Sequence, residues 1–182
     1  GAELRDIEEA SLMRRITYVS HQSYLFKGTV RDNLLMGKPG ASDDELWSAL
    51  TQVNLADFLR GEAGLDTLLS ERGENLSGGQ RQRLAIARAL AKKPEVVVFD
   101  DSFSALDYKT DARLREELAK NVTDAALVVV AQRIATIMHA DQIIVLDDGH
   151  VVGTGTHEEL LRSCPAYLEI AQSQLSACLL YT

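Results

Sequence analysis

The stretch from Leu76 to Asp107 decides the fold, and it reads Leu76-Ser77-Gly78-Gly79-Gln80, a basic segment, Val96-Val97-Val98-Phe99-Asp100-Asp101 and finally Ser104-Ala105-Leu106-Asp107. Ser77, Gly78 and Gly79 lack bulk, so their backbone N–H groups can approach a ligand closely. They open a predicted helix from Gln80 to about Ala91, and the positive end of a helix dipole attracts anions. This part of the stretch therefore predicts a cradle for phosphate.

The second part of the stretch predicts a buried strand that ends in two carboxylates. Four apolar residues, 96–99, lead directly into Asp100 and Asp101. In open α/β sheets such strands deliver side chains to the carboxyl edge, where ligands bind. A carboxylate at this edge can hold Mg²⁺. Taken alone, the Ser-Gly-Gly stretch could equally be an ordinary turn before a helix, and the paired Asp residues could equally be a solvated loop. The order of the pieces within the stretch is far more specific.

This order resembles the nucleotide-binding domain of ATP-binding cassette (ABC) transporters, whose signature loop, Walker B strand and D-loop match the three segments. The resemblance implies an α/β fold: a P-loop NTPase-like core with a mainly parallel sheet flanked by helices, plus a helical subdomain at about residues 29–91. It implies ATP and Mg²⁺ as cofactors and head-to-tail dimers of two ABC halves. The residues it assigns are Asp100 to Mg²⁺, Asp107 to the dimer interface, and Ser77, Gly78, Gly79 and Gln80 to the ATP held by the partner.

Composition places the chain among ordinary soluble domains. Its 182 residues are 46% hydrophobic and 25% charged, enough for one domain with a core. The net charge of −8 argues against a nucleic-acid partner. Cys164 and Cys178 have no metal-like spacing, so neither a disulfide scaffold nor a zinc site is predicted. The longest apolar run is too short to cross a bilayer, so we expect the piece to be cytosolic. The ABC resemblance implies a location at the cytoplasmic face of the membrane.

Both ends of the sequence look cut. The chain lacks the G-x-x-x-x-G-K-[ST] loop that grips phosphates in P-loop ATPases, so we expect residues 1–177 to be the C-terminal part of a nucleotide-binding domain. Without that loop the fragment itself is expected to be inactive as an ATPase. Residues 178–182 resemble a translated sequencing-adaptor tail, and we interpret them as non-native.

The segment before the signature points to an exporter. A predicted strand at 15–20 leads to Gln22, which matches the glutamine of the family's Q-loop and is implied to reach Mg²⁺ and the attacking water. The run from Leu25 to Leu34 resembles the exporter segment that faces the membrane domain, so a membrane domain fused upstream is expected. Helical spacing at 43–53 and 55–59 predicts the helical subdomain.

The remaining chain alternates helix and strand. We expect an amphipathic helix at 110–121 with Leu114 and Leu118 inward, a buried strand at 126–130, and a hairpin around Asp148-Gly149. Thr156 is a candidate N-cap. His150 and His157 are interpreted as surface residues.

Two residues depart from the family pattern in a way that bears on catalysis. The residue after the Walker B aspartate is usually Glu, and here it is Asp101; the switch loop usually carries His, and here it carries Gln132. An aspartate falls roughly 1 Å short of the attacking water, and misplacement on that scale can cost about 10²-fold in rate. Glutamine can donate a hydrogen bond but does not become cationic near neutral pH. Both changes weaken transition-state support rather than ATP binding.

The sequence therefore predicts the ATPase portion of an exporter for a small or lipophilic substrate, resembling the degenerate-site half of a heterodimer. Its signature loop would complete the partner's site, while Asp101 and Gln132 give its own site weakened catalytic groups. One alternative is a soluble ABC ATPase that acts on ribosomes or DNA. The other is a non-catalytic nucleotide-binding subunit.

Overall fold

The computed structural model describes residues 3–22, 24–103 and 106–174, and the chain divides into two compact units, Gly1–Val130 and Ala131–Thr182. The Ser104-Ala105 pair of the predicted D-loop lies outside the described residues, as do the predicted non-native tail and Cys178. Within the described ranges, the helices are all too short or too polar to cross a bilayer.

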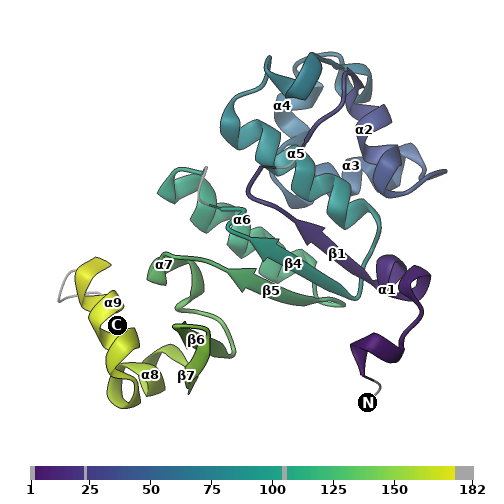
Figure 1. Cartoon of the computed structure of the whole chain (residues 1–182). Helices are drawn as coiled ribbons and strands as arrows, with labels where there is room; N and C mark the ends of the chain where they lie inside the picture. The colour runs from purple at the N-terminus through teal and green to yellow at the C-terminus, as the bar shows by residue number, and fades with distance from the viewer. Residues whose placement is uncertain (1–2, 23, 104–105, 175–182) are drawn as a thin grey trace. The chain divides into compact units, whose positions relative to one another are not determined.

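The first unit is built on a parallel sheet of three strands in the order β1-β4-β5, which are Ile16–Val19, Val96–Asp100 and Ala126–Val130. The register places Tyr18, Val98 and Val128 in one row across the sheet. Helices connect the strands, as parallel pairing requires, and all three strands deliver their carboxyl ends to the same edge (Figure 1). The predicted parallel α/β fold is confirmed.

Four helices between β1 and β4 pack on one another: α2 (Val30–Gly37), α3 (Asp43–Gln52), α4 (Ala56–Arg60) and α5 (Gly78–Ala91). Figure 1 shows α2, α3 and α4 gathered around α5. Short elements join them: η2 (Gly64–Asp66), η3 (Glu71–Gly73), and the antiparallel pair β2 (Gly28–Thr29) and β3 (Leu68–Leu69). Ahead of β1 lie η1 (Leu4–Asp6) and α1 (Glu9–Arg15). The helix predicted at 43–53 is confirmed at 43–52.

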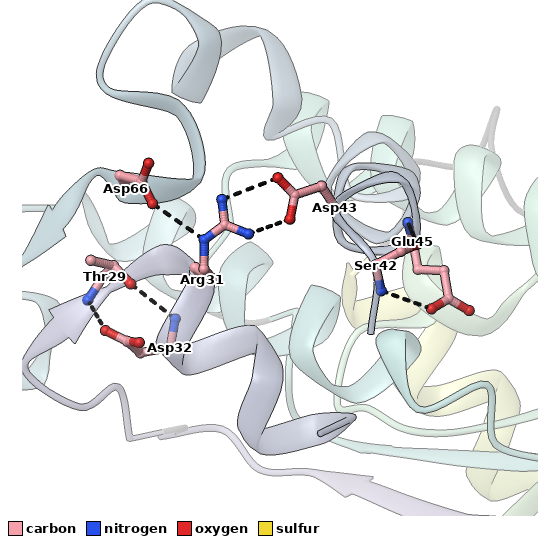
Figure 2. A network of polar contacts seen from close by, with 7 residues as sticks. All are labelled: Thr29, Arg31, Asp32, Ser42, Asp43, Glu45 and Asp66. Atoms are coloured by element: carbon pink, nitrogen blue, oxygen red, sulfur yellow. Dashed lines mark hydrogen bonds and ion pairs between the residues drawn. The ribbon is translucent and has the colours of Figure 1, made fainter. Parts of the chain in front are cut away.

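Capping residues decide where these helices begin. The side chains of Thr29 and Ser42 each accept a hydrogen bond from the backbone N–H three residues later. The acidic side chain at that later position accepts a hydrogen bond from the backbone N–H of the capping residue. Such capping boxes satisfy N–H groups that lack partners inside the helix. Figure 2 shows both boxes beside Arg31, which pairs with Asp43 at the start of α3 and, at 3.2 Å, with Asp66 of η2. One guanidinium therefore joins three elements.

The core of the first unit is continuous from the helices to the sheet. Leu34, Leu50 and Leu84 of the helices and Phe99 of β4 are all fully buried and belong to one cluster. Helix α6 (Tyr108–Asn121) adds Leu114 and Leu118, at 1% and 2% exposure, so the predicted inward face of this helix is confirmed.

The second unit has its own small core. It contains α7 (Ile134–Ile137), the hairpin β6 (Ile143–Asp147) and β7 (His150–Gly155), α8 (His157–Ser163) and α9 (Pro165–Gln174). The predicted turn is confirmed, because Asp148 and Gly149 both have positive φ and β6 pairs with β7. Thr156 caps α8 as predicted.

The prediction for His157 was wrong. This side chain is 9% exposed, and its Nδ1 lies 2.8 Å from the hydroxyl of Tyr167 on α9. His157, Leu160 and Leu161 are spaced i, i+3 and i+4 on α8, so they share the face that packs into the core. Burial is the main cause that lowers the pKa of His157. Helical spacing, rather than residue type, decides its environment.

Candidate functional site

The carboxyl ends of β1 and β4 bring acidic and polar side chains together. Asp100 is the last residue of β4, and the hydroxyl of Tyr18 on β1 donates a hydrogen bond to its Oδ2. The nearby carboxylate raises the pKa of Tyr18 through this bond. In register, Tyr18 faces the same side of the sheet as Val98, and Asp100 lies two residues further along that face. The structure thus presents an oriented carboxylate at the sheet edge.

Asp101 turns the chain sharply at this edge. Its φ is 49°, in the left-handed region, and its N–H donates to the carbonyl oxygen of Val130 on β5 at 2.9 Å. Its carboxylate lies 3.8 Å from Nδ1 of His21, which also lies 3.3 Å from the Asp101 carbonyl oxygen. The position of Asp101 is therefore fixed from two sides, by β5 and by the turn after β1.

Two further hydrogen bonds connect the strand ends to each other and to α5. The hydroxyl of Ser102, which is 1% exposed, donates to the carbonyl oxygen of Val19 at 2.6 Å. The side-chain amide of Gln82 on α5 donates to the carbonyl oxygen of Ser20 at 3.3 Å. The helix that follows the Ser-Gly-Gly loop is thus bonded directly to the end of β1.

The loop at the start of α5 has the geometry of an anion cradle. Oγ of Ser77 accepts from the N–H of Gln80 at 3.2 Å, and Oε1 of Gln80 accepts from the N–H of Ser77 at 2.8 Å. The hydroxyl hydrogen of Ser77 remains available as a donor, because a hydroxyl both donates and accepts. Gly78 and Gly79 contribute first-turn N–H groups that have no partner inside the helix.

Residues 1–104, more than half of the chain, match the protein family described as ABC transporter. The chain belongs to this family. It is an ABC ATP-binding domain.

Individual ABC relatives agree with this assignment. The chain is 48% identical over 96% of its length to an uncharacterized ABC transporter ATP-binding protein of Mycobacterium tuberculosis, of which it covers 30%. It is 40% identical over 92% of its length to a Staphylococcus aureus protein whose given name refers to multidrug export and to an ATP-binding/permease chain, and it covers 29% of that protein.

The structural comparison gives the same family. A bacterial Atm1-family ABC exporter solved with ATP bound matches 97% of this chain with a TM-score of 0.91 and 35% identity, and 31% of that exporter is covered. The chain therefore spans about three tenths of the length of the ABC proteins it matches.

Asp107 has a structural task in this ABC domain. Its carboxylate caps α6 by accepting from the N–H of Thr110 at 2.9 Å and from the Thr110 hydroxyl at 2.7 Å. These bonds lower the pKa of Asp107. Its assignment to the dimer interface stays a prediction, since capping already gives a reason for an aspartate at this position.

The two predicted glutamines lie at exposed positions. Gln22 is exposed in the turn directly after His21, and the structure directs His21, rather than Gln22, toward Asp101. Gln132 belongs to the second unit, where it is exposed and its carbonyl oxygen accepts from the side chain of Gln174 at 2.8 Å. The roles predicted for these glutamines remain untested.

Sequence reasoning missed the neighbours of the carboxylates, namely Tyr18, His21, Gln82 and Ser102. Pairing the predicted strand at 15–20 with the Walker B strand would have found Tyr18, because the period of two puts it on the face of Asp100. The contact of His21 with Asp101 depends on the exact turn after β1, for which the sequence carries no comparable signal.

The donors at the strand ends suit Mg²⁺. Asp100 and Asp101 supply carboxylate oxygens, and the side-chain amide of Gln22 supplies a carbonyl oxygen. Magnesium prefers oxygen ligands and is usually held by one or two carboxylates plus the phosphates of a substrate. Among the described residues no cluster of three or more His, Cys, Asp and Glu could enclose a metal by itself. The residues therefore fit a cation that is bound together with a nucleotide.

Proposed function

We propose that the chain is the ATP-binding and ATP-hydrolysing portion of an ABC exporter that works as a heterodimer. Its own ATP site hydrolyses slowly, while its signature loop completes a competent site on the partner half. The observation that carries this proposal is the geometry of Asp101, the residue that follows the Walker B carboxylate.

Asp101 cannot easily make up for its short side chain. Its backbone is held by the bond from its N–H to Val130, and its carboxylate lies near His21. An aspartate placed where a glutamate is usual falls roughly 1 Å short of an attacking water, a displacement that can cost about 10²-fold in rate. The site therefore binds nucleotide, but its carboxylate is poorly placed to accept a proton from the attacking water.

Gln132 acts in the same direction. Its amide can donate one hydrogen bond to a γ-phosphate oxygen but carries no positive charge. A cation at this place would stabilise the charge that develops in the transition state, so glutamine gives up part of that stabilisation. Asp101 and Gln132 together support an impaired site.

The signature loop is intact and suited to act on ATP held by the partner. The Ser77 hydroxyl and the N–H groups of Gly78 and Gly79 donate to phosphate oxygens, with α5 adding the positive end of its dipole. Gln80 keeps the loop in shape through its bond to the Ser77 N–H. When bound, Mg²⁺ neutralises phosphate charge, and Asp100 and Gln22 are the residues that would hold it.

The segment after the Q-loop is suited to contact a membrane domain. Tyr24 and Phe26 are 45% and 46% exposed, and their rings meet edge to face at 4.8 Å. The buried side chain of Asn33 fixes the backbone beneath them by bonding both the N–H and the carbonyl oxygen of Phe26 at 2.9 Å. An ordered, exposed aromatic pair is typical of a protein contact.

A contact of this kind supports a position at the cytoplasmic face of the membrane, beside a transmembrane domain fused upstream. The name of the Staphylococcus aureus relative, which refers to multidrug export and a permease, supports a small or lipophilic substrate. The ion pairs of Arg31 join α2 to α3 and η2, which supports a role in coupling the segment after the Q-loop to these elements (Figure 2).

The test is the steady-state ATPase rate of the full-length protein, alone and co-expressed with its neighbouring exporter half. We expect turnover only in the pair, its loss on Ser77→Ala in this chain, and a higher rate on Asp101→Glu. Full turnover by the protein alone that disappears on Asp101→Ala would show a homodimer with a working base. No turnover in either form, with ATP binding retained, would show a non-catalytic binding subunit.

A further inference from the structure

A pocket of about 320 Å³ lies in the first unit, away from the strand-end carboxylates. The end of α3, helix α4, the side chain of Arg83 from α5 and the start of α6 form its walls. This volume is at the lower end of the range for small-molecule sites. The pocket is large enough for a compact ligand.

The lining is strongly basic in an otherwise acidic chain. Four cations, Arg60, Arg83, Lys109 and Arg113, face the pocket with one carboxylate, Asp57, while the whole chain has a net charge of −8. Asp57 is already paired with Arg60 at 3.1 Å. The potential in the pocket therefore favours an anion.

Arg83 is the cation of this pocket whose side chain is held in place by hydrogen bonds. Its guanidinium donates to the carbonyl oxygens of Asn54 at 2.7 Å and Gly79 at 3.3 Å, so it is held by neutral acceptors. Burial lowers the pKa of Arg83, Asp107 raises it, and Arg113 lowers it with the smallest of the three effects. Arg113 therefore adds positive charge near Arg83, and both guanidinium groups line the same pocket.

Donors around the pocket exceed acceptors. Within the part of the chain that the structure describes, the side chains of Lys109 and Arg113 make no hydrogen bond or ion pair. Nδ2 of Asn54, which lines the pocket and has a φ of 54°, is buried without an acceptor. A buried donor without a partner is costly, and such groups are rare without a function. The pocket therefore has unpaired donors as well as an excess of positive charge.

We propose that this pocket binds a small anion that carries at least two phosphate groups. Arg83 and Arg113 each match a phosphate with a planar fork of donors, and Lys109 adds a mobile charge at the rim. The occupant would tie α4 to α6 through α5, the helix whose first turn forms the signature loop. It is a site separate from ATP hydrolysis, and the proposal does not depend on the function proposed above.

The chain contains a reporter for this site. Trp47 is its one tryptophan, and the guanidinium of Arg60 lies 5.1 Å from the centre of the Trp47 ring. An anion that draws Arg60 into the pocket alters this cation–π contact and with it the fluorescence of Trp47. The 182-residue chain would be titrated with inorganic pyrophosphate at constant ionic strength in EDTA, with fluorescence and calorimetry as readouts. ADP in a parallel titration distinguishes a free diphosphate from the phosphate tail of a nucleotide.

We expect saturable binding of one pyrophosphate per chain. Arg113→Gln should weaken the affinity at least tenfold, and the double variant Arg113→Gln, Lys109→Gln should weaken it further. Both side chains are exposed, so unchanged thermal unfolding midpoints serve as the fold check. Arg14→Gln, the loss of an exposed cation on α1, is the matched control and should bind as wild type. Ser77→Ala should also bind as wild type. The proposal is overturned if chloride at equal ionic strength gives the same response as pyrophosphate. It is also overturned if Ser77→Ala removes the response while Arg113→Gln leaves it intact.

Discussion

Nδ1 of His21 lies 3.8 Å from Oδ2 of Asp101 and 3.3 Å from the Asp101 carbonyl oxygen, although the two residues are 80 positions apart. The turn after β1 thereby contacts both the backbone and the carboxylate of the residue that follows the Walker B aspartate. In this turn the side chain that contacts Asp101 belongs to His21, one position before the predicted Q-loop residue Gln22.

His21 is expected to influence catalysis through Asp101. In the exporter pair with Ser77→Ala in this chain, the partner's site is silent and the residual ATPase reports this chain's own site. In that background Asp101→Glu should raise the turnover of this chain's own site about tenfold or more, because the longer side chain brings the carboxylate closer to the attacking water. The same substitution with His21→Ala should give a smaller gain, since the longer carboxylate then lacks the neighbour that orients it. A double-mutant cycle of ATPase rates measures the coupling.

The control for this cycle is His150→Ala, an exposed histidine in the hairpin of the second unit. It should leave the gain from Asp101→Glu unchanged. If the effects of His21→Ala and Asp101→Glu simply multiply, the contact between these residues has no catalytic role.

Ser77 has two tasks that substitution can separate. Ser77→Ala removes both the cap of α5 and the phosphate donor, and the lost cap alone costs about 1 kcal/mol of stability. Ser77→Asp keeps an acceptor for the Gln80 N–H but brings a negative charge toward the partner's ATP. We therefore expect Ser77→Asp to retain the wild-type unfolding midpoint while the ATPase of the pair falls at least as far as with Ser77→Ala. An active Ser77→Asp pair would limit Ser77 to capping.

Glu45 should make stability depend on pH in the acid range. Lys38, at 2.5 Å, and the N–H of Ser42 lower its pKa from 4.5 to about 2. A depressed folded-state pKa contributes stability above the unfolded pKa, and this contribution is lost as pH falls from about 4.5 toward 2. Glu45→Gln keeps the capping box, so it should lower the unfolding midpoint more at pH 6 than at pH 3.

Asp44→Asn is the matched control for this experiment, because it removes the same charge from the same turn of α3. Its effect on the midpoint should vary less between the two pH values. Equal pH dependence in both variants would assign the effect to net charge rather than to the Lys38 pair.

Much of the fold was predictable because its signals are local. The apolar run before Asp100 indicates a buried strand, Ser42 and Thr156 mark helix starts, and Asp148-Gly149 indicates a hairpin. Each depends on the backbone preferences of a few neighbouring residues. The start of α5 at Ser77 was predictable for the same reason, since a small-residue loop and the helix after it are adjacent in sequence.

The surroundings of the carboxylates were less predictable because they depend on register and packing between distant segments. Tyr18 meets Asp100 only because β1 pairs in parallel with β4 in one particular register. Arg83 and Arg113 line the same pocket only because α5 and α6 both border it. His157 was assigned to the surface because the sequence offers it no metal partner at useful spacing, whereas its place on the inward face of α8 buries it.

Gly37 should be the most sensitive glycine of the helix contacts. A Cβ at this position would lie 2.2 Å from the carbonyl oxygen of Arg88 on α5, so α2 and α5 can approach this closely only with glycine. Gly37→Ala favours the helix locally, but the clash is with backbone and requires α2 to shift, at a cost of about 1–3 kcal/mol. Gly61→Ala is the control, because its nearest contact is 3.3 Å and its loss should be smaller. Denaturant unfolding of both variants measures this difference, and an equal loss would mean that the close packing of α2 on α5 does not limit stability.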